Sequence, residues 1–128
     1  MANYTKLNLR GDVEDQAPKF GMPDGMEARF GARDLQSENT GVSLQRYEPG
    51  LEQPFAHKHG EVEEIYVVVA GSGRVRLDGE DVEVKQWDAI RIAPNAVHAV
   101  AAGPDGIEIL AFGPRGNDDT EMLEADWS

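Results

Sequence analysis

Apolar and polar residues alternate with a period of two along much of the middle of the chain. Residues 27–33 place apolar side chains on one face and charged side chains on the other, and residues 41–48 alternate again. Alternation of this kind predicts half-buried strands. Residues 63–70 are apolar on both faces, which is typical of a strand covered on both sides. Further short strands are predicted at residues 55–59, 74–77, 81–85, 87–93, 97–102 and 107–112.

Glycine, proline and asparagine separate these runs. Asp78-Gly79 is a strong hairpin signal, and turns are also predicted at Pro49-Gly50, Gly71-Ser72-Gly73, Pro94-Asn95 and residues 103–106. No internal segment shows a convincing helical period. Short strands at close spacing with turns between them predict an all-β fold, either an antiparallel sandwich or a barrel.

The two ends of the chain differ from this middle part. Residues 1–26 are broken by glycines and prolines, so we expect an irregular lead-in with one short strand near residues 4–9. Met22 and Met26 would plug the end of the core. Residues 114–128 are acidic, and we expect them to be a solvated tail with one short helical turn within residues 118–127, not needed for the site. The predicted barrel spans residues 27–113.

Composition narrows the function. With 128 residues the chain is most simply one domain, and 24 acidic against 12 basic residues give a net charge of −12. A surface this negative disfavours nucleic acid and anionic membranes as partners. The absence of cysteine excludes disulfides, thiolate metal sites and a cysteine nucleophile. No apolar run resembles a signal peptide or a membrane span, so we expect a cytoplasmic protein.

The histidines carry the main chemical signal. His57 and His59 are two residues apart, so on a strand both side chains leave the same face, where two imidazoles can share a metal ion. Glu64 could add an oxygen ligand from the next strand, and His98, the remaining histidine, follows the Pro94-Asn95 turn. The alternatives are surface histidines beside an acidic turn, a solvated Glu64, and a partly buried His98 in a core strand.

The same residues resemble the first sequence motif of the cupin superfamily, G-x5-H-x-H-x3,4-E-x6-G. His57, His59, Glu64 and Gly71 match it in spacing, and the leading glycine is displaced by one residue to Gly50. Only His98 strictly matches the second motif, G-x5-P-x-G-x2-H-x3-N; its other positions are occupied by Trp87, Ala93, Asn95 and Ala102. Asparagine is the best replacement for a glycine with positive φ, whereas Trp87 is expected to reshape the turn before its strand. The resemblance covers about residues 41–113.

This resemblance implies a double-stranded β-helix, or jelly-roll barrel, with a divalent metal held by His57, His59, Glu64 and His98. Glu63 is the rival carboxylate: it lies on the opposite face, and only the interval to Gly71 favours Glu64. Three imidazoles and one carboxylate suit Fe, Mn, Ni, Cu or Zn and leave open positions for a ligand. The resemblance also implies a homodimer, through exchange of an N-terminal strand or packing of an outer sheet face.

Two classes of function remain open. One is a metal-dependent enzyme that acts on a small organic molecule, of dioxygenase or isomerase type. The other is a non-catalytic barrel that binds or senses a metal or a small molecule. Tyr47, Tyr66 and Arg91, with Gln45 and Arg46, are candidate substrate contacts or proton donors, or else rim and surface residues. Barrel packing is expected from Phe30, Phe55, Val68, Ile90, Val100 and Phe112.

Overall fold

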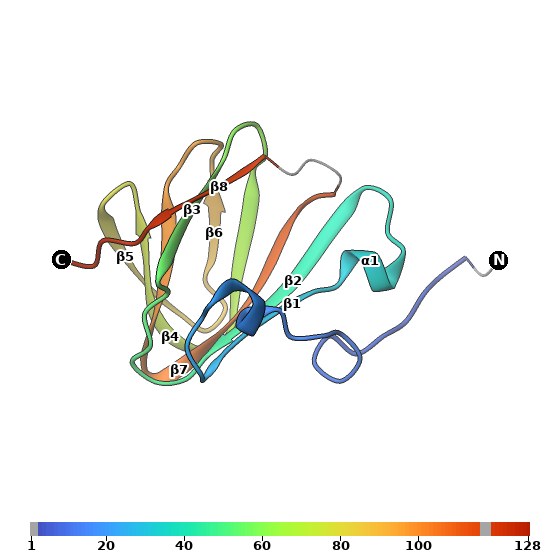
Figure 1. Cartoon of the computed structure of the whole chain (residues 1–128), viewed down its shortest axis with the longest axis horizontal. Helices are drawn as coiled ribbons and strands as arrows, with labels where there is room; N and C mark the ends of the chain where they lie inside the picture. The colour runs from blue at the N-terminus through green and yellow to red at the C-terminus, as the bar shows by residue number, and fades with distance from the viewer. Residues whose placement is uncertain (1–2, 116–118) are drawn as a thin grey trace.

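The computed structural model describes residues 3–115 and 119–128. These residues form antiparallel strands that curl around a common core, with a single turn of 3-10 helix and a single turn of α-helix (Figure 1). The predicted all-β barrel is therefore confirmed. The elements are η1 (Ala17–Phe20), β1 (Met26–Phe30), α1 (Ala32–Leu35), β2 (Thr40–Tyr47), β3 (Phe55–His59), β4 (Glu64–Leu77), β5 (Glu80–Lys85), β6 (Ala89–Ile92), β7 (His98–Pro114) and β8 (Thr120–Glu124).

Two long strands, β4 and β7, pair with each other and take part in both layers of the barrel. The first half of β4 also pairs with β6, and its second half pairs with β5. Likewise, the second half of β7 pairs with β2, and its first residue pairs with β3. One layer is thus β1-β2-β7-β4-β6 and the other is β8-β3-β7-β4-β5.

The glycines at Gly71 and Gly73 mark a bend within β4, so the turn predicted there is wrong. Gly71 pairs with Ile107 and Gly73 with Ala102, which leaves one residue of β4 opposite four of β7. Gly71 has φ +73°, and a Cβ on it would collide with the backbone carbonyl of Gly106. Glycine in a strand marks a bulge or a close backbone approach as readily as it marks a turn. Residues 103–106 likewise lie inside β7. The predicted strands at residues 63–70 and 74–77 are therefore one strand, β4, and those at residues 97–102 and 107–112 are one strand, β7.

The C-terminal segment forms a strand, β8, where a helical turn was predicted within residues 118–127. Residue 118 lies outside the described residues. β8 pairs with β3 along its whole length and lies beside it in Figure 1. Trp127 then donates a hydrogen bond from Nε1 to the carbonyl of Gln53 (2.9 Å), and its ring lies 5.0 Å from the Arg74 guanidinium and 5.3 Å from that of Arg76. The pairing satisfies the outer edge of β3, which would otherwise expose unpaired backbone groups.

At the other end, residues 4–9 form no strand, and the strand predicted over residues 27–33 stops at Phe30 before α1. Neither helix among the described residues is long and apolar enough to cross a membrane.

The core lies between the two layers. Its largest fully buried side chains come from β4, β6 and β7, and they are those of Val68, Val75, Ile92, His98, Val100 and Ile109.

Candidate metal centre

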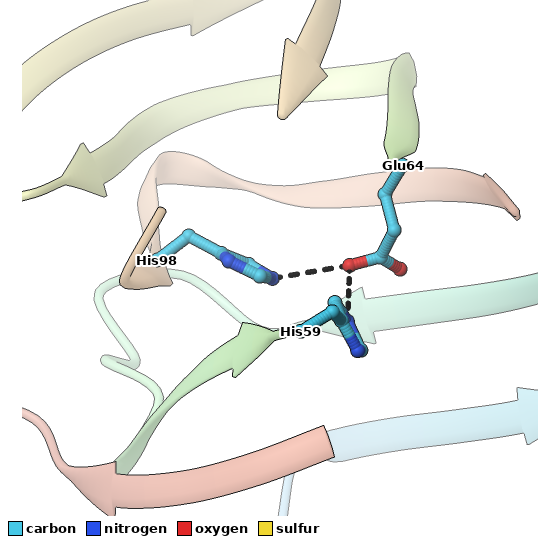
Figure 2. Close-up of side chains that lie close together, drawn as sticks. All are labelled: His59, Glu64 and His98. Atoms are coloured by element: carbon cyan, nitrogen blue, oxygen red, sulfur yellow. Dashed lines mark hydrogen bonds and ion pairs between the residues drawn. The ribbon is translucent and has the colours of Figure 1, made fainter. Parts of the chain in front are cut away.

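Three strand ends bring potential metal ligands together. His59 is the last residue of β3, Glu64 the first of β4 and His98 the first of β7. The Oε1 atom of Glu64 lies 2.6 Å from Nε2 of His59 and 3.2 Å from Nε2 of His98 (Figure 2). One ligand atom from each residue lies within 4.8 Å of the others, so the group could hold a metal ion.

His98 tests whether this group suits a cation. Its side chain is 1% exposed, and Nδ1 lies 3.0 Å from the carbonyl oxygen of Ala96. Because a carbonyl only accepts, Nδ1 carries the hydrogen, and the Nε2 lone pair is directed at the Glu64 carboxylate. Nε2 is buried and has no hydrogen-bond partner among the residues that the structure describes. A lone pair facing a carboxylate oxygen fits a cation between them, and an Nδ1–H bound to a carbonyl is the usual support for such a ligand.

His59 is oriented by the C-terminal segment. Its Nδ1 lies 3.0 Å from the hydroxyl of Thr120 and 3.6 Å from Oδ1 of Asp119. Asp119 also accepts a hydrogen bond from the backbone N–H of Glu61 through Oδ2 (2.7 Å), which ties it to the turn between β3 and β4. The sequence analysis missed both residues, because they lie about sixty positions from His59 in a segment that resembled a solvated acidic tail.

His57 lies on the same face of β3 as His59 and pairs in register with His98. The rings of His57 and His98 have centroids 5.9 Å apart, but His57 lies outside the group of three. Burial lowers the pKa of His57 to about 4 against the opposing effect of Glu64. At neutral pH the ring is therefore uncharged and keeps a lone pair free to bind a metal.

Glu64, and not Glu63, faces the histidines. Burial raises the pKa of the Glu64 carboxyl, but the hydrogen bond with His59 (2.6 Å) outweighs this effect and brings the pKa to about 2, so the group is ionised. Glu63 points outward, where one oxygen lies 3.5 Å from the Arg91 guanidinium, and both side chains are exposed. Arg91, one of the candidate catalytic residues, therefore does not reach the site.

A cavity of about 510 Å³ opens beside this group. Tyr47 and Tyr66 line it, and burial raises the pKa of both phenols, so they stay protonated. Tyr47 donates a hydrogen bond to Gln45 (2.7 Å), and the ring of Tyr66 meets that of His98 edge-on at 5.7 Å. The other lining residues are mainly apolar: Phe20, Met22, Ala28, Phe30, Ser43, Gln53, Phe55, Thr120 and Met122.

At two positions where the second cupin motif has glycine and this chain does not, the backbone keeps the conformation that favours glycine. Trp87 and Asn95, which occupy two glycine positions, adopt φ +74° and +68°. The Trp87 side chain extends into solvent with 70% exposure. The backbone N–H of Asn95 donates a hydrogen bond to the carbonyl of His59 (2.6 Å), so this turn braces the end of β3 next to the candidate ligands.

Comparison with known proteins agrees with this fold. A family model described as a cupin domain matches residues 43–112, and the chain belongs to the cupin family. An uncharacterised protein of Methanocaldococcus jannaschii is 41% identical over 71 residues, which cover 53% of this chain and 57% of that protein. The chain thus spans little more than half of that relative.

Solved structures resemble nearly the whole chain. A cupin protein from Bacteroides fragilis is 27% identical, with a TM-score of 0.73 over 98% of this chain and 92% of its own. The polyketide cyclase RemF from Streptomyces resistomycificus is 22% identical, with a TM-score of 0.74 over 97% of this chain and 87% of its own. Oxalate decarboxylase from Bacillus subtilis is 23% identical, with a TM-score of 0.75 over 96% of this chain and 32% of its own. At these identities the last two show the fold alone.

Proposed function

We propose that the chain binds one divalent transition metal through His57, His59, Glu64 and His98, and that it is an enzyme of dioxygenase or isomerase type acting on a small organic molecule. The observation that carries the proposal is the buried Nε2 of His98, which has no hydrogen-bond partner in the described part of the chain and lies 3.2 Å from the ionised carboxylate of Glu64. Its other nitrogen is already bound by Ala96, so the free lone pair is suited to a metal.

The donor set of imidazoles and one carboxylate suits Fe, Mn, Ni, Cu or Zn. When bound, such a metal supplies Lewis acidity and, if it is iron or copper, the capacity to activate oxygen. The chain's own residues orient the donors and line the cavity. Tyr47 and Tyr66 keep their protons at neutral pH. Tyr66 can donate a hydrogen bond to a bound molecule, whereas the Tyr47 hydroxyl already donates to Gln45 and offers its oxygen as an acceptor. The homodimer and the cytoplasmic location implied earlier stay part of this proposal.

The alternative is a barrel that binds a metal or a small molecule without turnover. The two enzymes among the structural neighbours resemble this chain in fold alone, and one fold can carry many functions. The alternative would be favoured by stoichiometric metal combined with a lack of turnover of any molecule that the cavity binds.

The first test is metal analysis of protein purified without an affinity tag or chelator, and again after loading with each candidate ion. The adjacent carboxylates give a matched pair: we expect Glu64→Gln to lose the metal and Glu63→Gln to keep it, because Glu64 faces the histidines and Glu63 pairs with Arg91. His57→Ala tests the fourth ligand and should weaken binding. Wild-type protein that takes up none of the ions would refute the proposal.

A further inference from the structure

The residues that line the cavity carry very little charge. Among the described residues, no lysine or arginine lines it, and its ionisable groups other than the buried phenols are the three histidines and Glu64. A carboxylate, sulfonate or phosphate buried without a cationic partner loses far more hydration energy than it regains. Within the enclosed part of the cavity, a bound molecule can therefore place an anionic group only against the proposed metal.

One arginine lies next in sequence to two residues that line the cavity, but its side chain is paired outside it. Arg46 lies between Gln45 and Tyr47 on β2, and because side chains alternate along a strand, it projects to the other face. There it forms ion pairs with Glu27 (2.6 Å) and Glu108. The face of β2 that lines the cavity thus offers neutral hydrogen-bonding groups.

The outer part of the cavity is apolar although it is open to solvent. Phe20, Phe30 and Met122 line the cavity and are 43%, 48% and 43% exposed. The rings of Phe20 and Phe30 meet edge-on with centroids 6.2 Å apart. We call these three residues, from η1, β1 and β8, the apolar rim. Large apolar side chains gathered at an opening are typical of a site for an apolar ligand.

We propose that the cavity takes a ring compound that presents a hydroxyl or enol oxygen to the metal and is otherwise uncharged and apolar, and that it rejects molecules with a second anionic group. This inference rests on the proposed function and names its substrate class. The oxygen end would lie toward Glu64 and the histidines, where Tyr47, Tyr66 and Gln45 offer neutral hydrogen bonds. The rings would pack against the apolar rim.

The test compares two probes on zinc-loaded protein, because Zn²⁺ has no redox chemistry. The probes are a naphthalenediol with adjacent hydroxyls and the sulfonate of the same diol, which share the metal-binding group and differ by one charge. Calorimetric titration should give at least about tenfold tighter binding of the uncharged diol, after correction for the affinities of both probes for free Zn²⁺. Metal content is measured first, so a failure to bind zinc is recognised separately as a failure of the proposed function.

Two lysine substitutions sharpen the test. Phe30→Lys adds a cation to the apolar rim. The ratio of the dissociation constants of the sulfonate and the diol should then fall to about one. Trp87→Lys makes a matched change at an exposed aromatic residue that does not line the cavity, and should leave the preference unchanged. The inference is overturned if zinc-loaded wild-type protein binds the sulfonate as tightly as the diol, or if it binds neither.

Discussion

Replacing Thr120 by valine should weaken metal binding without unfolding the protein. Thr120 reaches Nδ1 of His59 from β8 at 3.0 Å, and a ring N–H bound in this way holds the opposite nitrogen toward Glu64. Valine keeps the branched shape and the strand preference of threonine, so β8 should stay paired with β3. The substitution therefore isolates the hydroxyl.

The size of the effect follows from the number of partners removed. Loss of such supporting contacts weakens metal affinity by about 10- to 100-fold. Thr120→Val leaves Asp119 at 3.6 Å from the same nitrogen, so we expect the lower limit, about tenfold or about 1.4 kcal/mol. The double variant Asp119→Asn, Thr120→Val removes both partners and should approach about 100-fold, or about 2.7 kcal/mol.

Competition with a chromophoric chelator for Zn²⁺ at neutral pH measures these affinities, and thermal melting of the metal-free proteins shows that they are folded. Glu121→Gln is the control: Glu121 follows Thr120 on the opposite face of β8, where its exposed side chain forms an ion pair with Lys58 (3.4 Å). Affinities of both valine variants within about twofold of the wild type would show that β8 does not support His59, as the initial prediction of a dispensable tail required.

Two further predictions concern stability. Gly71→Ala should lower the free energy of unfolding by about 3 kcal/mol, because a Cβ there meets the carbonyl of Gly106. Gly79 also has a positive φ but faces open space, so Gly79→Ala should lower it by only about 1 kcal/mol. Thermal melts measure both, and equal losses of stability would contradict the close approach at Gly71. In metal-free protein, His57 stays neutral down to about pH 4, while the unfolded chain takes up its proton near pH 6.5. The free energy of unfolding should therefore fall as the pH drops through this window, by about 3 kcal/mol more in the wild type than in His57→Gln. Urea unfolding at a series of pH values measures this difference. Parallel pH profiles of the two proteins would show that His57 is not buried as described.

Local signals predicted the elements that depend only on neighbouring residues. The strand over residues 55–59 matches β3, and Asp78-Gly79 forms the hairpin between β4 and β5, because alternation and a two-residue turn act over a few positions. The resemblance to the cupin motifs implied that His59, Glu64 and His98 lie together, and the structure brings them together at three strand ends.

Pairing between distant segments could not be predicted in this way. Gly71 and Gly73 have the same local signature whether β4 turns back or bends, and the register with β7 decides between the two. The support that Asp119 and Thr120 give to His59 depends on β8 joining the edge of β3. Composition obscured that strand, because its acidic side chains resembled a solvated tail.

The distribution of charge links the fold to the proposed chemistry. The chain carries a net charge of −12, yet among the described residues only one carboxylate, that of Glu64, lines the cavity. Alternation along β2 and the outward position of Glu63 keep Arg46 and Arg91 in ion pairs outside it. A divalent cation beside one carboxylate and neutral imidazoles leaves a single net positive charge, which one ionised hydroxyl or enol can neutralise. The selection of ligand by charge thus follows from which strand faces point inward.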